Sequence, residues 1–448
     1  MKVILVNPPI YDFSAYDVWI KPLGLLYLSN ILKTHNIEVV FLDCLDRSYF
    51  ETLVVKPDGT GKLPSTIVDK PNILKDIPLK YKRYGINKEI IKNFFLENND
   101  ADYLIISCSM TYWYLGIREI LDIAKETLKQ TKILLGGIYP TLVPKHAYLT
   151  FTNKVDYIFV SSNFSELFAY IGLDAKNLNF TNFPAPDYSH YKNLYYIVTR
   201  FSYGCHYNCS YCACRKIFPK YTAKTVEQFV NEVYTLYNQT KCKNFVFYDD
   251  ELLNFTTTKQ LFYEFLKLNL PIKFFTPNGL NPRFINKEIA KLMYELNFTD
   301  PRLSLEFTSD FTHDITDKKI TFKEFEIAVE NLINAGYKPH QISVYLLAGL
   351  PYETLNDVFH SLELLSKYYV RIRLCELSPV PKTQLYYQLG LDDTVDPLLH
   401  NNSIFIFNGV PGKVKPWCSY EELQLLKKFV KDYNESLKQK TIHSYAHY

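Results

Sequence analysis

Short apolar runs alternate with amphipathic stretches along the first third of the chain. Runs typical of strands lie at residues 2–6, 38–42, 103–108, 132–135 and 155–160. Between them, residues 23–33, 89–96 and 117–129 place apolar side chains at helical spacing. Unbroken apolar strands separated by helices are typical of a parallel sheet that is covered on both faces. The pattern therefore predicts a doubly wound α/β domain over residues 1–172.

Two stretches interrupt this alternation. Residues 47–86 are rich in Lys, Pro, Asp and Gly and show no clear period, which predicts a long surface insertion in the first domain. Residues 173–194 contain a run rich in Pro and Asn at 177–188 and are predicted to form a linker.

The alternation of strands and helices resumes after the linker. Strand-like runs lie at 195–199, 244–248, 273–276, 302–306, 342–348 and 371–377, and helical patterns at 226–237, 258–268, 287–296, 322–335 and 355–367. Six strands joined by helices favour an incomplete (β/α)6 barrel over a second small sheet, and we expect this partial barrel over residues 195–390. Residues 391–448 form a C-terminal extension with an amphipathic helix at 421–438.

The composition limits the class of protein. The chain has 448 residues, of which 47% are hydrophobic and 22% charged, and its net charge is +3. This balance argues against a disordered chain, and the absence of a Lys/Arg stripe argues against a nucleic-acid partner. The N-terminal apolar run is shorter than a signal-peptide core, and no run is long enough to span a membrane. We therefore expect a soluble protein of a reducing cytoplasm.

Four of the nine cysteines lie within ten residues of one another. Cys205, Cys209, Cys212 and Cys214 follow the first predicted strand of the barrel, at the strand end where catalytic residues collect. Thiolates at this spacing select zinc or an iron–sulfur cluster. A structural zinc ion would take four protein ligands, with Cys214 or His206 as the fourth. A cubane cluster held by three thiolates would instead leave one iron open for a substrate.

The cysteine loop, with an aromatic residue at Tyr211 before the third cysteine, resembles the motif of the radical S-adenosylmethionine (radical SAM) enzymes. Further motifs of this family follow in register at the ends of the predicted strands, at residues 248–251 (YDDE), 276–280 (TPNGL), 303–306 (LSLE), 349–354 (GLPYET) and 378–383 (SPVPKT). The sequence departs from the family pattern at Tyr352 and Lys382, where glycine is usual. These two departures predict a changed backbone shape at the two turns.

The resemblance implies a [4Fe-4S] cluster that is held by Cys205, Cys209 and Cys212, with Cys214 as a bystander. It also implies that SAM binds to the open iron and is cleaved reductively to methionine and a 5′-deoxyadenosyl radical, with electrons from a donor such as flavodoxin or ferredoxin. The SAM contacts that it implies are Tyr211, Asp249, Asp250, Glu251, Glu306, Gly349 and Pro351. An alternative role for the three consecutive acidic residues is to cap a helix N-terminus, where the helix dipole favours negative charge.

Motifs in the first domain resemble the Rossmann-like cobalamin-binding domain of one large branch of radical SAM enzymes. A doubly wound sheet binds ligands beyond the carboxyl ends of its strands, and the motifs lie at such ends. The cobalamin contacts that the resemblance implies are Asn7, Pro8, Ser107, Ser109, Thr111, Gly136, Gly137, Pro140 and Thr141. Residues 8–22 contain no histidine, so the loop that supplies a lower cobalt ligand in other cobalamin proteins is missing. The alternative is that these small residues only form tight turns.

Three functions remain open from the sequence. The first is a cobalamin-dependent radical SAM enzyme, for instance a methyltransferase that acts on an unactivated carbon. The second is a radical SAM enzyme without cobalamin that catalyses a rearrangement, a cyclisation or another group transfer. The third is a zinc-stabilised binding protein without catalytic activity. No motif identifies the substrate.

Overall fold

The computed structural model describes the chain except for residues 51–52, 162, 175–177, 255, 309–316, 318 and 446–448, and it describes side chains as far as residue 437. The chain divides into two compact units. Unit 1 comprises Met1–Thr199, Glu232–Cys242 and Asp392–Asn401, and unit 2 comprises Arg200–Asn231, Lys243–Leu391 and Asn402–Tyr448.

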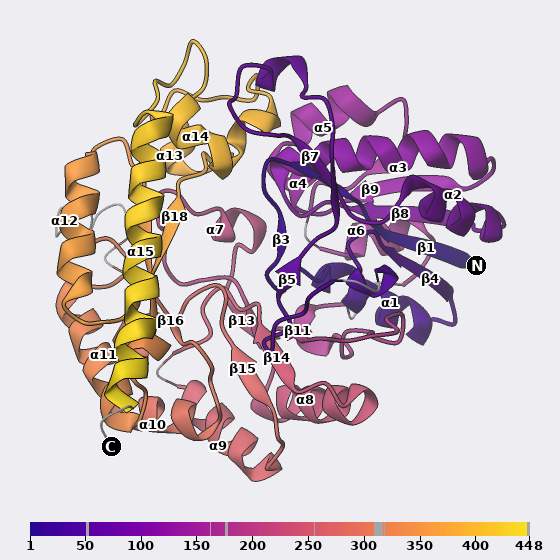
Figure 1. The fold of residues 1–448 in the computed structure, drawn as a ribbon. Coiled ribbons are helices and arrows are strands. Elements are labelled where there is room, and N and C mark those ends of the chain that lie inside the picture. Colours follow the sequence, from indigo (N-terminus) through magenta and orange to yellow (C-terminus); the bar gives the residue numbers. More distant parts are fainter. Residues whose placement is uncertain are drawn as a thin grey trace. The chain divides into compact units, whose positions relative to one another are not determined.

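A five-stranded parallel sheet forms the centre of unit 1 (Figure 1). In sheet order its strands are β10 (Tyr157–Ile158), β9 (Lys132–Gly136), β8 (Tyr103–Ser107), β1 (Lys2–Asn7) and β4 (Glu38–Asp43). Because β1 pairs with both β4 and β8, the strand order reverses beside β1. The doubly wound sheet predicted from the apolar alternation is therefore confirmed.

Helices cover the sheet of unit 1. They are α1 (Leu23–Thr34), α2 (Lys88–Glu97), α3 (Tyr114–Thr127), α4 (Ile138–Leu142), α5 (Pro144–Phe151) and α6 (Ser165–Tyr170). Apolar side chains of α1 and α6, including Leu28, Ile31 and Phe168, form one core with Val3 and Leu5 of β1. Right-handed crossovers place α1 on the opposite face from α2 and α3, as Figure 1 shows.

Residues 47–86, which the sequence predicted to be a surface insertion, contribute buried side chains to unit 1. They contain β5 (Gly61–Lys62), β6 (Ser65–Ile67) and β7 (Lys82–Tyr84), which pair with β3 (Tyr16–Asp17) and β2 (Ile10–Asp12) in two small antiparallel sheets. Leu74, Tyr81 and Ile86 are at most 2% exposed. The surface prediction is wrong for these side chains, because paired strands of two or three residues are too short to leave a period in the sequence.

Unit 2 contains parallel strands separated by helices. After β11 (Ile197–Thr199) the chain forms β12 (Ser202–Tyr203), β13 (Thr222–Ala223), β14 (Asn244–Phe247), β15 (Lys273–Phe275), β16 (Arg302–Glu306), β17 (Ser343–Ala348) and β18 (Arg371–Glu376). β14 pairs with β15, and β16, β17 and β18 form a second parallel ladder. An isolated bridge joins Leu280, after β15, to Leu303. The described strands follow the predicted alternation and form an open rather than a closed barrel.

The helices of the second half agree with the predicted ranges to within a few residues, except that α15 continues to Tyr445, beyond the predicted end at 438, and that the pattern missed several short helices. They are α7 (Cys214–Ile217), α8 (Val226–Thr240), α9 (Thr258–Leu268), α10 (Lys287–Glu295), α11 (Phe322–Ala335), α12 (Leu355–Ser366), α13 (Gln384–Gln388), α14 (Asn402–Asn408) and α15 (Tyr420–Tyr445). Thr321 and Thr354 complete capping boxes that set the starts of α11 and α12. The Asn434 amide bonds the backbone of Ile372, which fixes α15 against β18. Among the described helices, none has the length and apolar character needed to cross a membrane.

Gly116 provides a test of how unit 1 packs. A Cβ atom at Gly116, in α3, would lie 1.9 Å from the carbonyl oxygen of Pro9, whereas a Cβ at Gly24, in α1, would meet no atom within 4 Å. We expect Gly116→Ala to lower the free energy of unfolding by about 2 kcal/mol or more, because the backbone of Pro9 cannot move aside cheaply. The matched Gly24→Ala variant should be neutral or more stable by up to about 1 kcal/mol, because alanine favours the helix. Urea unfolding followed by circular dichroism measures both, and equal effects of the two substitutions would contradict this account.

Candidate active site

The predicted metal ligands Cys205, Cys209 and Cys212 lie on one loop of unit 2, between β12 and α7. Three hydrogen bonds anchor this loop to distant parts of the unit. The Gly204 amide donates to Asp250 Oδ2 over 3.0 Å, the Asn208 amide donates to Asp317 Oδ2 over 2.8 Å, and the Leu385 amide donates to the Ser210 carbonyl over 2.8 Å. The loop is therefore held at its start, middle and end.

Gly204 permits the turn that starts the loop. Its φ is +83°, and a Cβ atom there would lie 2.7 Å from the carbonyl oxygen of Lys220. Both the backbone conformation and the close approach require glycine at this position.

None of the three thiols is part of a disulfide, and they lie close enough to influence one another electrostatically. Burial raises the pKa of Cys205 to about 11, and burial together with the neighbouring Glu306 carboxylate raises the pKa of Cys209. Cys212 is exposed. The described residues contain no preformed group of three His, Cys, Asp or Glu side chains in metal-ligand geometry. The loop thus supplies soft donors with no disulfide among them, which suits a metal or cluster that organises the thiolates as it binds.

Of the three consecutive acidic residues after β14, Asp249 and Asp250 hold the backbone before the cysteine loop. Asp249 Oδ2 accepts from the Phe201 amide over 3.1 Å, and its Oδ1 accepts from the Ser202 amide and hydroxyl over 2.6 and 2.8 Å. Burial raises the pKa of Asp249 to about 6. Asp250 bonds Gly204 and lies 3.5 Å from the Arg200 guanidinium. The chain itself therefore occupies much of the acceptor capacity of these two carboxylates.

Glu306 and Lys319 form a largely buried ion pair, of intermediate exposure, beside the cysteines. Lys319 Nζ lies 3.1 Å from Glu306 Oε1, and the two side chains are 14% and 16% exposed. Burial alone would lower the pKa of Lys319, but Glu306, Cys209 and Glu251 act in the opposite direction and raise it above its usual value. Lys319 therefore remains a cation next to the predicted metal ligands. The sequence analysis missed it, because no motif surrounds it.

Two buried polar atoms among the predicted SAM contacts have no hydrogen-bond partner among the described residues. They are the Tyr211 hydroxyl and Glu306 Oε2. Glu306 also has φ +70° and lies at a register shift between β16 and β17. Strained backbone of this kind is concentrated at functional sites, and buried polar atoms are normally bonded. These observations fit a ligand that is bound by Tyr211 and Glu306.

Glu251, after β14, is buried, and the other two predicted SAM contacts, Gly349 and Pro351, lie after β17. Gly349 has φ +105°, and a Cβ atom there would lie 2.5 Å from the side chain of Ile406, so packing alone requires glycine. Pro351 is exposed. Lys382, which replaces a usual glycine, adopts φ +67°, so the left-handed turn is present despite the substitution. Tyr352 is 64% exposed and is not among the residues with positive φ.

A second residue that the sequence analysis missed, Arg283, supports the cysteine loop. Its Nη1 donates to the Tyr207 hydroxyl over 3.2 Å, and its Nε donates to Glu324 Oε1 over 2.8 Å. Glu324 also completes the capping box of α11 with Thr321. The only signal in the sequence was the capping pattern, Thr followed three residues later by Glu, which does not predict the contact with Arg283.

In unit 1, the predicted cobalamin contacts gather at the carboxyl edge of the sheet. Asn7 ends β1, Ser107 ends β8 and Gly136 ends β9, and Ser107 lies directly opposite Gly136 in the strand register. β1 and β8 adjoin the point where the strand order reverses, where doubly wound sheets bind ligands. Pro8 follows β1 directly and is buried.

Most of the polar side chains at this edge already have partners in the protein. Asn7 Nδ2 donates to Asp43 Oδ1 over 2.7 Å, the Thr111 hydroxyl lies 3.3 Å from His400 Nδ1, and the Thr141 hydroxyl donates to the Gly137 carbonyl over 2.8 Å. Pro140 is buried in α4, Ser107 is half-buried and Ser109 is exposed. The edge therefore presents serine hydroxyls and glycine backbone to a ligand rather than a ring of polar side chains.

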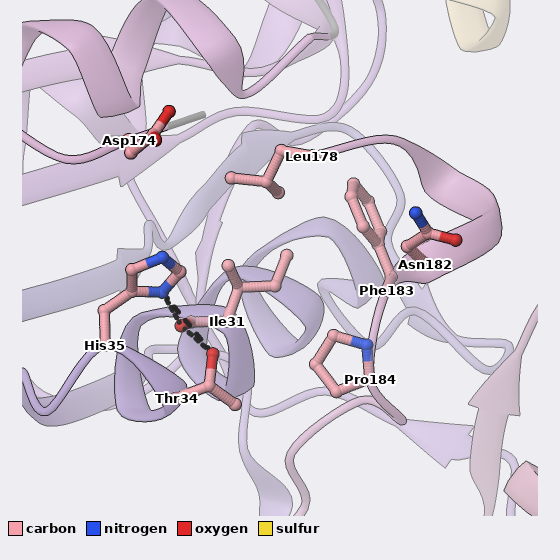
Figure 2. A pocket seen from close by; sticks show the side chains of 8 residues that line it. All are labelled: Ile31, Thr34, His35, Asp174, Leu178, Asn182, Phe183 and Pro184. Atoms are coloured by element: carbon pink, nitrogen blue, oxygen red, sulfur yellow. Dashed lines mark hydrogen bonds between the residues drawn. The ribbon is translucent and has the colours of Figure 1, made fainter. Parts of the chain in front are cut away.

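A separate pocket of about 420 Å³ lies at the end of α1 (Figure 2). Ile31, Leu178, Phe183 and Pro184 supply its apolar lining, and Thr34, His35, Asp174 and Asn182 its polar lining. His35 Nδ1 donates to the Ile31 carbonyl over 2.9 Å. None of the predicted cofactor contacts lines this pocket.

The comparisons with known proteins agree with this arrangement. Residues 199–365 match the family model of the radical SAM superfamily. This part of the chain, which contains the cysteine loop, is therefore a radical SAM domain. No curated protein matches the sequence of the chain.

Solved structures extend the similarity to the first half of the chain. The structure of the cobalamin-dependent S-adenosylmethionine radical enzyme OxsB with aqua-cobalamin bound matches with a TM-score of 0.57 at 16% identity, over 82% of this chain and 52% of that one. The same enzyme with aqua-cobalamin and S-adenosylmethionine bound matches with a TM-score of 0.56 at 14% identity, over 96% of this chain and 61% of that one. The chain thus shares the fold of a cobalamin-dependent radical SAM enzyme, and it spans little more than half the length of these structures.

Glu251 provides a test of the electrostatics of the site. Burial raises the pKa of its carboxyl to about 7, above the unfolded value of 4.5. Because the folded state holds this proton more tightly, the stabilisation is fully present below the unfolded pKa and is lost as the pH rises through about 7. The shift corresponds to about 3 kcal/mol. In urea titrations of the metal-free protein, we expect Glu251→Gln to flatten this decline in the free energy of unfolding.

Glu227→Gln is the matched control, because Glu227 lies exposed in the first turn of α8. It should leave the pH dependence as in the parent protein. If Glu251→Gln and Glu227→Gln give the same curve, the carboxyl of Glu251 does not titrate as described.

Proposed function

We propose that the protein is a radical SAM enzyme in which Cys205, Cys209 and Cys212 hold a [4Fe-4S] cluster. When bound, the cluster supplies one electron for the reductive cleavage of SAM to a 5′-deoxyadenosyl radical. The observation that carries the proposal is the loop of three cysteines within a domain of this family, beside buried polar atoms that lack partners among the described residues. A reduced partner, such as a flavodoxin or a ferredoxin, would supply the electron.

The residues around the cysteines suit this chemistry. Lys319 places a positive charge close to Cys209, and a nearby cation favours the thiolate form that binds iron. Asp249 and Asp250 fix the start of the loop through backbone amides. The Tyr211 hydroxyl and Glu306 Oε2 are available to SAM, and Glu306 would accept hydrogen bonds from its ribose hydroxyls. Glu251, whose pKa burial raises to about 7, would favour its charged form beside the ammonium group of SAM.

We further propose that unit 1 binds cobalamin at the carboxyl edge of its sheet. The support is the position of Asn7 and Ser107 at the reversal of strand order, with Gly136 opposite Ser107, together with the fold shared with a protein whose structure holds aqua-cobalamin. A bound cobalamin would extend the chemistry to methyl transfer to an unactivated carbon. Radical chemistry without cobalamin remains the alternative that a binding measurement would separate.

The cluster is tested by removing one ligand. We expect Cys209→Ser to lose iron and sulfide after anaerobic reconstitution, and its formation of 5′-deoxyadenosine from SAM and dithionite should fall by more than about a hundredfold. The loss of a ligand should exceed the 10–100-fold effect that is typical of removing an outer hydrogen-bond partner. Iron and sulfide analysis and chromatography of the nucleoside measure the two effects.

Cys214→Ser is the matched control, because Cys214 lies two residues beyond the last predicted ligand. It should keep its iron and its visible absorbance. Stoichiometric zinc without iron in the parent protein would overturn the radical reaction and favour a structural zinc site.

The cobalamin site is tested at Gly136. A Cβ atom there meets only the Cβ of Phe159, at 3.9 Å, so a side chain at this position disturbs the packing little, whereas Gly137 has φ +97° and close backbone neighbours. We expect the protein to retain hydroxocobalamin through gel filtration, and Gly136→Val to weaken this binding by about tenfold or more, because the valine fills space beyond the strand end. Gly24→Ala should bind normally. An equal retention by Gly136→Val and the parent protein would place cobalamin elsewhere.

A further inference from the structure

The sheet β16–β18 has one apolar face and one polar face. Side chains alternate between the two faces along each strand. One set, including Leu303, Val344 and Ile372, is buried and apolar. The other set reads Arg302 and Ser304 on β16, Ser343, Tyr345 and Leu347 on β17, and Arg371, Arg373 and Cys375 on β18, while Glu306 lies beyond the register shift of β16.

The polar face points towards the interior of unit 2. The Tyr345 hydroxyl donates to the carbonyl of Pro277 over 2.6 Å. A Cβ atom at Gly279 would lie 2.7 Å from the hydroxyl of Ser304. Both partners belong to the segment that follows β15, so this face is turned inward. An inward face with this many polar groups is not explained by packing, which favours apolar side chains.

Three arginines on this face share one carboxylate. Asp300 lies 3.1 Å from Arg302 Nε and 3.6 Å from Arg371 Nη1, and it also pairs with Arg373 Nη2. The Ser343 hydroxyl donates to the same carboxylate. Asp300 therefore supplies one negative charge to three guanidinium groups. An ion pair that only stabilised the fold would need one arginine at this position, because each further cation adds repulsion and a desolvation cost.

Arg373 has bonding capacity left over. Its Nε is buried and has no hydrogen-bond partner among the described residues, while its side chain remains 29% exposed. Arg371 is 33% exposed. Guanidinium groups in this situation bind planar or tetrahedral anions through two parallel hydrogen bonds.

The position of Arg373 relates it to the proposed SAM site. Cys375 lies two residues further along β18, which corresponds to a rise of roughly 7 Å. Cys375 is within electrostatic reach of both Arg373 and Glu306. A molecule whose anionic end binds at Arg373 therefore needs only a few further atoms to reach Glu306.

We propose that the substrate carries an anionic group, a carboxylate or a phosphate, that is bound by Arg373 and Arg371 on the inner face of β16–β18. The assignment of this anion to the substrate rests on the proposed radical SAM function. Anion binding itself requires neither the cluster nor SAM, so the two proposals can fail separately.

The test uses the full chain without a cluster and two probes, orthophosphate and succinate, titrated separately and followed by ligand-observed NMR. We expect saturable binding, and the probe that binds more tightly identifies the anion as phosphate or carboxylate. Arg373→Gln should weaken binding by about tenfold, because it removes a charge-assisted pair of hydrogen bonds. Arg118→Gln, which removes the same charge from an exposed position of unit 1, should leave binding unchanged.

Two further variants guard against misfolding. Arg373→Lys keeps the charge but loses the paired donors, and it should bind with intermediate affinity. Asp300→Asn removes the competing carboxylate, and it should bind severalfold more tightly. A structural role alone predicts no gain in Asp300→Asn. Binding that is absent in the parent protein, or equal in the parent and Arg373→Gln, would overturn the proposal even if the same preparation accepts a cluster and cleaves SAM.

Discussion

The site in unit 2 depends on the hydrogen bonds that a buried carboxylate, Asp249, and a half-buried one, Asp250, accept from the backbone leading into the cysteine loop. Asp249 and Asp250 accept from the amides of Phe201, Ser202 and Gly204. Because an amide buried without a partner costs about 1–3 kcal/mol, these bonds determine where the loop begins. The acidic residues at this strand end thus primarily position the backbone of the protein, and a contact with a cofactor is secondary. The helix-cap alternative that the sequence left open is wrong for Asp249 and Asp250, because the amides that they bond belong to a strand and a loop and not to a helix.

Glu306 differs from Asp249 in the number of its oxygens that accept hydrogen bonds from the chain. It lies at a strand irregularity, in a left-handed conformation that few residues adopt, and one of its oxygens is buried without a partner. Both oxygens of Asp249 accept hydrogen bonds from the chain, whereas Oε2 of Glu306 has no partner among the described residues and could accept from a ligand. Lys319 neutralises the other oxygen and thereby makes the burial of this carboxylate tolerable.

The sequence predicted long periodic elements well and contacts between distant residues poorly. β16 and α11 occupy the predicted ranges, because five to fourteen consecutive residues carry the pattern. The strand predicted at 155–160 shrinks to Tyr157–Ile158, because it lies at the edge of the sheet and pairs only with β9. No local sequence pattern marks Lys319 or Arg373, because their ion-pair partners, Glu306 and Asp300, are not neighbours in the sequence. Motifs at strand ends were visible because parallel strands bring their carboxyl ends together whatever the intervening loops.

The two candidate sites differ in what they leave for a ligand. At the sheet edge of unit 1, Asn7, Thr111 and Thr141 bond other parts of the protein, so a large cofactor would be held by shape and by contacts with glycine backbone. On the inner face of β16–β18, the protein instead leaves positive charge in excess, because three arginines face the single carboxylate of Asp300. This excess charge would orient an anionic molecule along the strands. In the proposed radical reaction, such orientation would place one carbon of the substrate next to the radical and so select the hydrogen atom that is removed.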